Sequence, residues 1–196
     1  MNLDDYQTVF MVTILGLSLV VVSPTIGLYL PSGGERFSEL WILGPGHMAE
    51  GYPFNVVAGD VYRVFVGVGC HLGGSTYYAV VVKFRNQTQP LPNATVAEPS
   101  SLPALFEFQM FVEDGDVWEA PVDFAVMDVS VGVNTTVVGR LLVNGVLFEV
   151  DLPAVWDAVF AGFFYQLFFE LWLYDSDTDE FRYYNRFVGL WLNMTV

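Results

Sequence analysis

The stretch Thr76-Tyr-Tyr-Ala-Val-Val-Val-Lys-Phe-Arg85 is rich in β-branched and aromatic residues, which favour extended structure. Its side chains alternate with a period of two, and Lys83 and Arg85 lie on one face. The opposite face is apolar and consists of Tyr78, Val80, Val82 and Phe84. This pattern predicts a strand with one buried face and one face in water.

Similar short runs recur along the chain between turns rich in Gly, Pro, Asn and Asp, and each is expected to form a strand. The other runs are 37–43, 52–57, 61–68, 105–112, 117–127, 136–143, 146–150, 167–174 and 187–194. Asn144-Gly145 is the strongest hairpin signal. We also expect hairpins around the turns 71–75 and 113–116. The close spacing of strands and turns predicts an Ig-like antiparallel β-sandwich.

Residues 153–165 start with a proline and carry apolar residues at helical spacing, which predicts one short helix packed on a sheet. The next run, 167–174, is apolar on both faces, so the helix is a candidate to cover its second face. The alternative is an exposed apolar patch, including Phe168 and Trp172, that binds a partner subunit or a membrane surface. Residues 86–102 hold three prolines without periodicity and are expected to form an exposed, mobile loop.

Residues 9–30 form an uncharged, apolar run of 22 residues. A helix of this length rises about 33 Å, enough to cross a hydrocarbon core of roughly 30 Å. The leader, residues 1–8, has no Lys or Arg, and no Ala-x-Ala-like site follows before Pro31, unlike a cleaved signal peptide. We therefore expect a retained single transmembrane helix that contacts membrane lipid, followed by one β-domain over residues 31–196.

Asn-x-Thr triplets indicate the side of the membrane. They begin at Asn86, Asn93, Asn134 and Asn193. Four of the chain's eight Asn residues lie in such triplets, whereas composition alone would give about one. Arg36, the first basic residue, follows the apolar run and favours a cytoplasmic domain, but long domains translocate largely regardless of flanking charge. We expect a single-pass protein of the cell membrane with a glycosylated extracytoplasmic domain.

The composition excludes several classes of protein. The net charge is −15, with seven Lys and Arg against 22 Asp and Glu, so nucleic acid backbones would be repelled. With 54% hydrophobic residues, the chain can fill a large core. Cys70 is the single cysteine, so no disulfide forms within the chain. Stability must come from packing, glycans or neighbouring subunits.

Asp175, Asp177 and Asp179 have the alternate spacing of calcium ligands. The rest of a calcium loop is missing, because Glu180 stands where the sharp turn needs Gly and Arg186 where a bidentate Glu belongs. A solvated hairpin turn is the favoured interpretation, and calcium is the alternative.

Cys70 and His71 adjoin, with His47 and Met48 elsewhere, but this spacing matches no metal motif. We expect no metal and no cofactor. The chain also lacks a Gly-x-Ser-x-Gly motif, and two histidines without a placed nucleophile give no catalytic set. The sequence therefore favours a protein that is not an enzyme.

One block of sequence resembles a known family. Phe37-Ser-Glu-Leu-Trp-Ile-Leu-Gly-Pro45, followed by Ala49-Glu-Gly-Tyr-Pro-Phe-Asn-Val-Val-Ala-Gly-Asp60, is similar to the archaeal domain of unknown function 1616. The likeness continues through 66–71, 111–118, 171–174, 183–184 and 190–192. It implies an archaeal membrane protein with an extracytoplasmic β-sandwich, and it supplies no catalytic residues. Two features depart from the family: one membrane segment instead of several, and Cys70-His-Leu72 in place of an Asn-His-Glu-like turn.

Three functions remain open. The favoured one is a structural or accessory subunit, in a homo- or hetero-oligomer, that contacts a larger membrane or envelope complex through aromatic residues. The second is a pilin-like filament subunit with the N-terminal helix in the filament core, against which the leader lacks a basic processing site. The third is a carbohydrate- or ligand-binding module, which would show an open aromatic shelf instead of a filled core.

Overall fold

The computed structural model describes residues 6, 7, 9–18, 35–93 and 95–195. The chain divides into two compact units, Met1–Arg36 and Phe37–Val196. In the first unit, residues 6, 7 and 9–18 are helical. No helix among the described residues is both long and apolar enough to span a membrane. The remainder of the predicted transmembrane segment, 19–30, lies outside the described residues.

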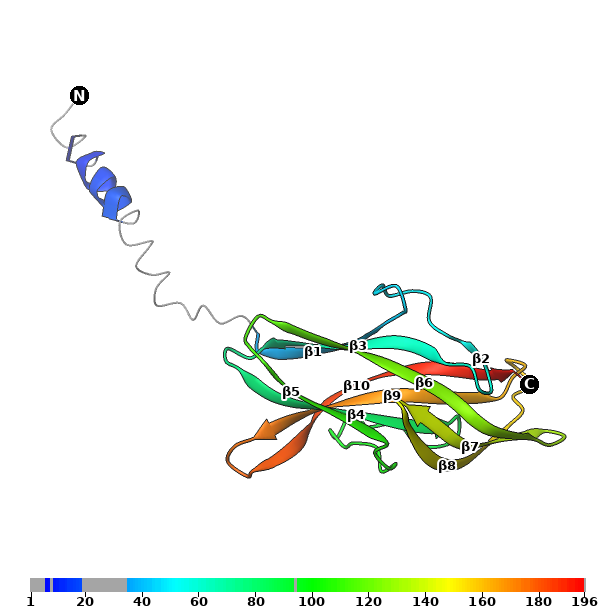
Figure 1. Ribbon diagram of the computed structural model, residues 1–196. Helices are drawn as coiled ribbons and strands as arrows, with labels where there is room; N and C mark the ends of the chain where they lie inside the picture. Colours follow the sequence, from blue (N-terminus) through cyan, green and yellow to red (C-terminus); the bar gives the residue numbers. More distant parts are fainter. Residues whose placement is uncertain (1–5, 8, 19–34, 94, 196) are drawn as a thin grey trace. The chain divides into compact units, whose positions relative to one another are not determined.

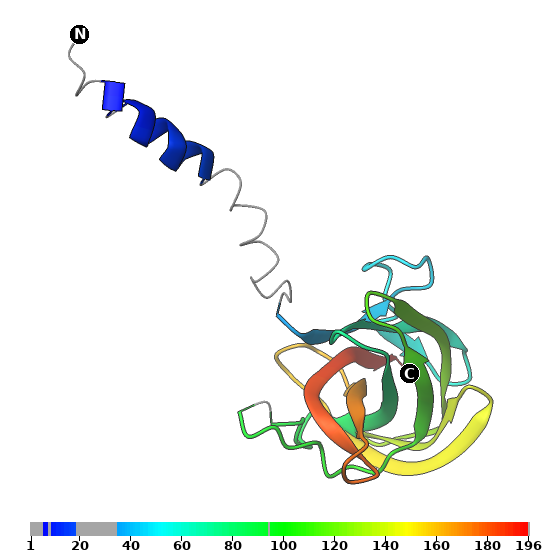
Figure 2. The same ribbon diagram turned by 90° about the vertical axis from the view of Figure 1, so that its left-hand side faces the viewer.

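The second unit is a β-sandwich of two five-stranded sheets (Figures 1 and 2). The strands are β1 Phe37–Leu43, β2 Asn55–Val57, β3 Tyr62–His71, β4 Thr76–Asn86, β5 Phe106–Val112, β6 Val117–Val131, β7 Thr135–Val143, β8 Val146–Val155, β9 Phe164–Asp175 and β10 Glu180–Thr195. Sheet A has the order β1-β3-β6-β7-β8, and sheet B has the order β2-β10-β9-β4-β5. Neighbouring strands are antiparallel, except that β2 runs parallel to β10. The two packed sheets confirm the predicted β-sandwich. Their five-plus-five strand order differs from the four-plus-three order of an Ig constant domain.

The core lies between the two sheets. The apolar face of β4 is buried as predicted, with Tyr78, Val80, Val82 and Phe84 in one cluster. Tyr165 of β9 links the sheets, because its hydroxyl donates to the carbonyl oxygens of Thr136 and Leu152 in sheet A at 2.9 and 3.2 Å. Burial raises the pKa of Tyr165, so this donor stays protonated.

The turns divide into two kinds. The Asn144-Gly145 hairpin is confirmed, since Val143 pairs with Val146 and both turn residues have positive φ, as a type I′ turn requires. The predicted pairings of β3 with β4 and of β5 with β6 are wrong, because each pair is divided between the two sheets. A turn of four or five residues is long enough to cross the roughly 10 Å between packed sheets.

The predicted helix over residues 153–165 is also wrong. Strand β8 continues to Val155, and β9 begins at Phe164. Between them lies a tight turn, closed by a bridge between Asp157 and Gly162. The Asp157 Oδ1 atom accepts the backbone N–H groups of Val159 and Phe160 at 2.8 and 3.1 Å, which fixes the turn in place of a helix.

The sequence predicted that the face of β4 with Lys83 and Arg85, which is part of the outer face of sheet B, is exposed to water. In the structure this face is covered. Lys83 and Arg85 are only 4% and 5% exposed. Residues 87–93 and 95–105, here called the cover segment, lie between β4 and β5, and the backbone of Ser100 bonds to Lys83 and Glu170 on this face. Most of its described residues are exposed, as expected of the loop, but Pro92 and Ser100 are buried. It takes the place that the predicted helix was expected to fill.

Candidate functional site

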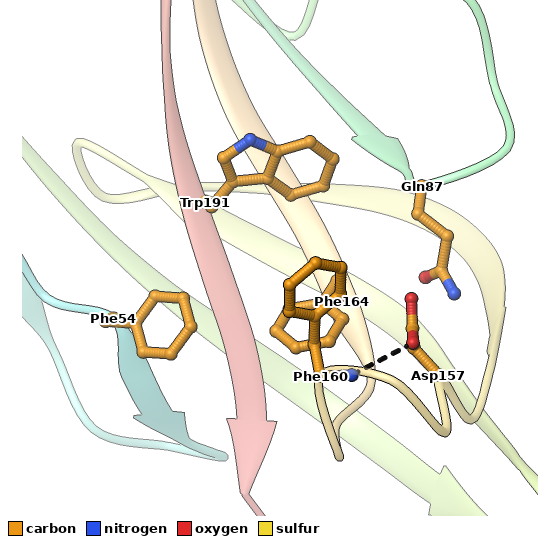
Figure 3. Close-up of a pocket in the computed structure, with 6 residues that line it drawn as sticks. All are labelled: Phe54, Gln87, Asp157, Phe160, Phe164 and Trp191. Atoms are coloured by element: carbon orange, nitrogen blue, oxygen red, sulfur yellow. Dashed lines mark hydrogen bonds between the residues drawn. The ribbon is translucent and has the colours of Figure 1, made fainter.

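An aromatic pocket of about 520 Å³ opens at one end of sheet B, where the cover segment begins. It is lined by Phe54, Gln87, Asp157, Phe160, Phe164 and Trp191 (Figure 3). Strand β4 ends here and β9 begins here, since Asn86 pairs with Tyr165. The chain enters β1 at the opposite end of the sandwich, whereas the C-terminus lies at the pocket end (Figure 1).

Three separate stretches of the chain bring the four aromatic rings together. Phe164 and Trp191 lie on the outer face of sheet B, where the adjacent strands β9 and β10 pair. Phe54 precedes β2, and its carbonyl oxygen accepts the N–H of Asn193 at 2.6 Å. The Phe164 ring lies 6.1 Å from the Phe54 ring and 6.2 Å from the Phe160 ring, the latter in an edge arrangement. Sheet register and one tight turn therefore build the walls.

Trp191 is supported by a buried cation. The Arg85 guanidinium lies 5.1 Å from the centroid of the Trp191 ring. Arg85 itself donates to Gln166 Oε1 at 2.7 Å and to the carbonyl oxygen of Gln89. Burial lowers the pKa of Arg85. Since 39% of Trp191 remains exposed, the ring is fixed by its neighbours yet open to a ligand.

The polar rim consists of Asp157 and Gln87. Asp157 Oδ1 is used by the turn, as described above, and Gln87 Nε2 donates to the carbonyl oxygen of Val155 at 2.9 Å. Gln87 Oε1 is covered but has no hydrogen-bond partner. Of the six lining residues, Asp157 is the only ionisable one. The pocket thus offers aromatic faces and oxygen acceptors, which suits binding.

The sequence predicted a partner-binding patch at Phe168 and Trp172, but neither residue lines the aromatic pocket. Phe168 has no exposed surface. Trp172 is half-buried, and its Nε1 atom donates to Glu170 Oε2 at 3.2 Å. The sequence left two alternatives for this strand, a second face covered by another part of the chain or an exposed patch. The structure shows that both faces of β9 are covered at Phe168. A docking surface that includes Phe168 is incompatible with this burial.

The four Asn-x-Thr triplets differ in accessibility. Asn86 is 8% exposed, and its Nδ2 atom, which would carry a glycan, donates to the carbonyl oxygen of Pro153 at 2.8 Å. Asn193 is half-buried, and its Nδ2 donates to Asn55 Oδ1 at 3.0 Å.

The other two triplets have exposed asparagines. In the triplet of Asn134, however, Thr136 is fully buried. In the triplet of Asn93, both Asn93 and Thr95 are exposed. The surface therefore favours modification at Asn93 first and at Asn134 second.

The three aspartates with calcium-like spacing serve the turn between β9 and β10. Asp175 accepts the N–H of Asp177 at 2.9 Å and pairs with Arg182 at 3.0 Å. Asp179 accepts the hydroxyl of Tyr174. Within the described part of the chain, no group of three or more His, Cys, Asp or Glu side chains is placed to hold a metal ion.

The Cys70 and His71 side chains also have separate surroundings. Cys70 is buried in the core, and its Sγ lies 3.5 Å from the carbonyl oxygen of Gly74. His71 packs on Phe37, with 4.8 Å between ring centroids. His47 instead lies 2.6 Å from Glu119.

Sequence reasoning missed the aromatic pocket. Its six residues come from four stretches of chain, and no spacing in the sequence links them. Asp157, Phe160 and Phe164 fell within the predicted helix 153–165, and Phe54 and Trp191 fell within predicted strands to which no site was assigned. A usable signal was the alternation in β10, which puts Trp191 on the face opposite to Leu190 and Leu192.

Among solved structures, the chain is similar to parts of much larger proteins. A calcium-binding mutant of Bacteroides uniformis beta-glucuronidase 2 matches with a TM-score of 0.37 and 7% identity, over 79% of this chain and 13% of that one. A Listeria innocua beta-glucosidase in complex with glucose matches with a TM-score of 0.33 and 12% identity, over 61% of this chain and 16% of that one. No curated protein matches the chain.

The family comparison is more specific. The family model described as a domain of unknown function (DUF1616) matches residues 31–137. The match includes the blocks 37–45 and 49–60 on which the resemblance was based, and it covers more than half of the chain. This chain therefore belongs to the family of the domain of unknown function DUF1616.

Proposed function

We propose that this protein is a non-enzymatic binding subunit, anchored in the cell membrane by residues 9–30, whose extracytoplasmic β-sandwich joins a larger archaeal membrane or envelope complex. In this proposal, the aromatic pocket holds a side chain of the partner. The observation that carries it is the exposure of the pocket's rings: Phe160 is 74% exposed, Phe54 48% and Trp191 39%.

Exposed aromatic rings that share a pocket are a feature of interaction sites. A single exposed apolar residue is ordinary, but a contiguous group indicates a surface that a partner covers. Trp and other aromatic anchors carry much of the energy at protein interfaces. The contact between Arg85 and Trp191 holds one anchor in place before binding, which lowers the entropy lost on association.

The location in the cell rests on the sequence. The uncharged run 9–30 is long enough to cross a bilayer, and the exposed triplet at Asn93 is a glycan acceptor if the domain is exported. A membrane-anchored subunit also meets its partners in two dimensions, so a single pocket of modest affinity is sufficient to hold it in a complex.

A carbohydrate-binding module is the second candidate. The observation in its favour is the open aromatic shelf, with Trp191 as a flat platform and with Asp157 and Gln87 as neighbouring acceptors. A sugar ring would stack on the indole and donate hydroxyl hydrogen bonds to the rim.

Co-purification from the native membrane tests the main proposal. The full chain and its Phe160→Ala and Trp191→Ala variants are extracted in mild detergent, and the accompanying proteins are identified by mass spectrometry. Phe111→Ala is the matched control, because Phe111 is 76% exposed but lies at the other end of sheet B. Loss of the same partner in both pocket variants, but not in the control, is expected. Partners that all three variants retain would contradict the proposal.

A further inference from the structure

The chemistry of the pocket narrows the kind of partner, and this inference rests on the proposed function. We infer that the aromatic pocket binds a lysine side chain of a protein partner. The methylene stem of that lysine packs on the rings, and its ammonium group reaches Asp157.

The charge in the pocket favours a cation. Asp157 is the one ionisable lining residue, and none of the ion pairs formed by the described residues includes it. Its carboxylate is half-buried beside aromatic rings, where an opposite charge interacts more strongly than in open water. The net charge of −15 adds a long-range field that attracts basic segments.

The walls suit a long aliphatic side chain that ends in a cation. Four aromatic rings provide apolar area for methylene groups, and phenyl faces attract a cation that lies above them. A volume of about 520 Å³ accommodates such a side chain together with its flanking backbone.

The oxygen atoms of the rim distinguish lysine from arginine. Asp157 Oδ1 already accepts two backbone N–H groups, so Oδ2 is the oxygen left for a ligand. Arginine prefers to fork onto both carboxylate oxygens, whereas an ammonium group binds as a point charge with three donors. Gln87 Oε1 lacks a donor and lies on the same rim, where the Gln87 amide and the Asp157 carboxylate point toward one another (Figure 3). Because Gln87 Oε1 is covered, the ammonium group is placed at Asp157 Oδ2.

Arg85 is the cation that opposes this arrangement. It lies behind Trp191, is 5% exposed and does not line the pocket. Its charge weakens the attraction of the indole for a second cation. The ammonium group is therefore placed at Asp157 and the phenyl rings, and Trp191 contacts the methylene stem.

Three peptides that differ in one side chain test the inference. The full chain in lipid nanodiscs is titrated with acetyl-Gly-Xaa-Gly-amide, where Xaa is Lys, Arg or the neutral isostere norleucine, and binding is followed by ligand NMR. The lysine peptide is expected to bind about tenfold more tightly than the norleucine peptide, with arginine between them. Equal affinity for lysine and norleucine, no measurable binding of any peptide, or binding of soluble oligosaccharides alone would overturn the inference.

The variant Asp157→Asn isolates the charge, because asparagine keeps the Oδ1 acceptor that closes the turn. It is expected to lower the affinity for the lysine peptide to that for norleucine and to leave norleucine binding unchanged. Glu180→Gln removes an exposed carboxylate outside the pocket and serves as the control. If Phe160→Ala abolishes co-purification of the partner while Asp157→Asn does not, the lysine inference fails and the proposed function stands. If neither variant changes co-purification, both fail.

Discussion

Lys83 Nζ lies 2.9 Å from Glu170 Oε2, and this ion pair is buried between sheet B and the cover segment. The pair holds Ser100 at two points. Glu170 Oε1 accepts the Ser100 N–H at 2.8 Å, and Lys83 donates to the Ser100 carbonyl oxygen at 2.6 Å. The outer face of sheet B is therefore closed at this point, and the aromatic pocket lies at one end of the sheet.

Replacing one partner of this pair should be costly. Lys83→Met leaves the Glu170 carboxylate buried without its cation, and a loss of about 3–5 kcal/mol in the free energy of unfolding is expected. The double variant Lys83→Met/Glu170→Met removes both charges and should recover most of that loss. Urea unfolding followed by circular dichroism measures both. If Lys83→Met lowers the free energy of unfolding by less than about 1 kcal/mol, the Glu170 carboxylate can be buried without its cation at little cost, which would contradict this expectation.

Phe168 and Phe160 should respond oppositely to the same substitution. Phe168→Asp puts a carboxylate into a fully buried site, which costs several kcal/mol and should prevent stable folding. Phe160→Asp changes a side chain that is 74% exposed and should keep the wild-type melting temperature within about 2 °C. Thermal unfolding compares the two variants. A folded Phe168→Asp protein would contradict the burial described here.

Glycan occupancy should follow accessibility. If the domain is exported, Asn93→Gln is expected to remove a glycan from the intact mass, and Asn134→Gln to remove one with lower occupancy. Asn86→Gln should leave the glycan mass unchanged, because Asn86 Nδ2 is committed to the carbonyl oxygen of Pro153. It should instead lower the stability of the domain. A glycopeptide that carries sugar on Asn86 would contradict this order.

Acid should weaken the fold partly through Asp123. Arg63 donates to both carboxylate oxygens of Asp123, at 2.5 and 2.6 Å, and these hydrogen bonds lower the pKa of that carboxyl below its usual value. The unfolded chain therefore binds the proton more readily. The stabilisation is fully present above the unfolded pKa of about 4 and is lost as the pH falls through the lower folded value.

Asp123→Asn should accordingly flatten the decline in unfolding midpoint between neutral pH and about pH 3, and Arg63→Gln should flatten it in the same way. Urea midpoints measured across that range provide the check. An acid dependence that is unchanged in both variants would show that this pair makes no contribution.

Much of the sandwich could be predicted because strands are local patterns. The run 76–85 alternates with a period of two, the run 37–43 is bounded by turn residues, and Asn144-Gly145 sets its own turn geometry, so β1, β4 and the β7–β8 hairpin were found with accurate positions. Pairing across longer turns could not be predicted. The turn 113–116 would allow a hairpin, but β5 and β6 belong to different sheets.

The candidate site was less accessible to sequence reasoning. The apolar residues in 153–165 have helical spacing, but the same residues also fit the end of one strand, a tight turn and the start of the next strand. The hydrogen bonds that the Asp157 side chain accepts in the turn favour the second arrangement. The burial of Phe168 depends on a cover segment whose prolines suggested an exposed loop. Exposure is a property of the folded chain, so neither the covered face nor the open pocket had a local signature.

Photo-cross-linking in the native membrane is the most direct test of whether the aromatic pocket holds a protein partner. A benzophenone amino acid is placed at Phe160 in the pocket and, separately, at Phe111, which is equally exposed at the other end of sheet B. A discrete cross-linked protein is expected from position 160 and none from position 111, and Trp191→Ala is expected to remove the product. Cross-linking from position 111 alone, or a product at position 160 that survives Trp191→Ala, would contradict a partner held in the aromatic pocket.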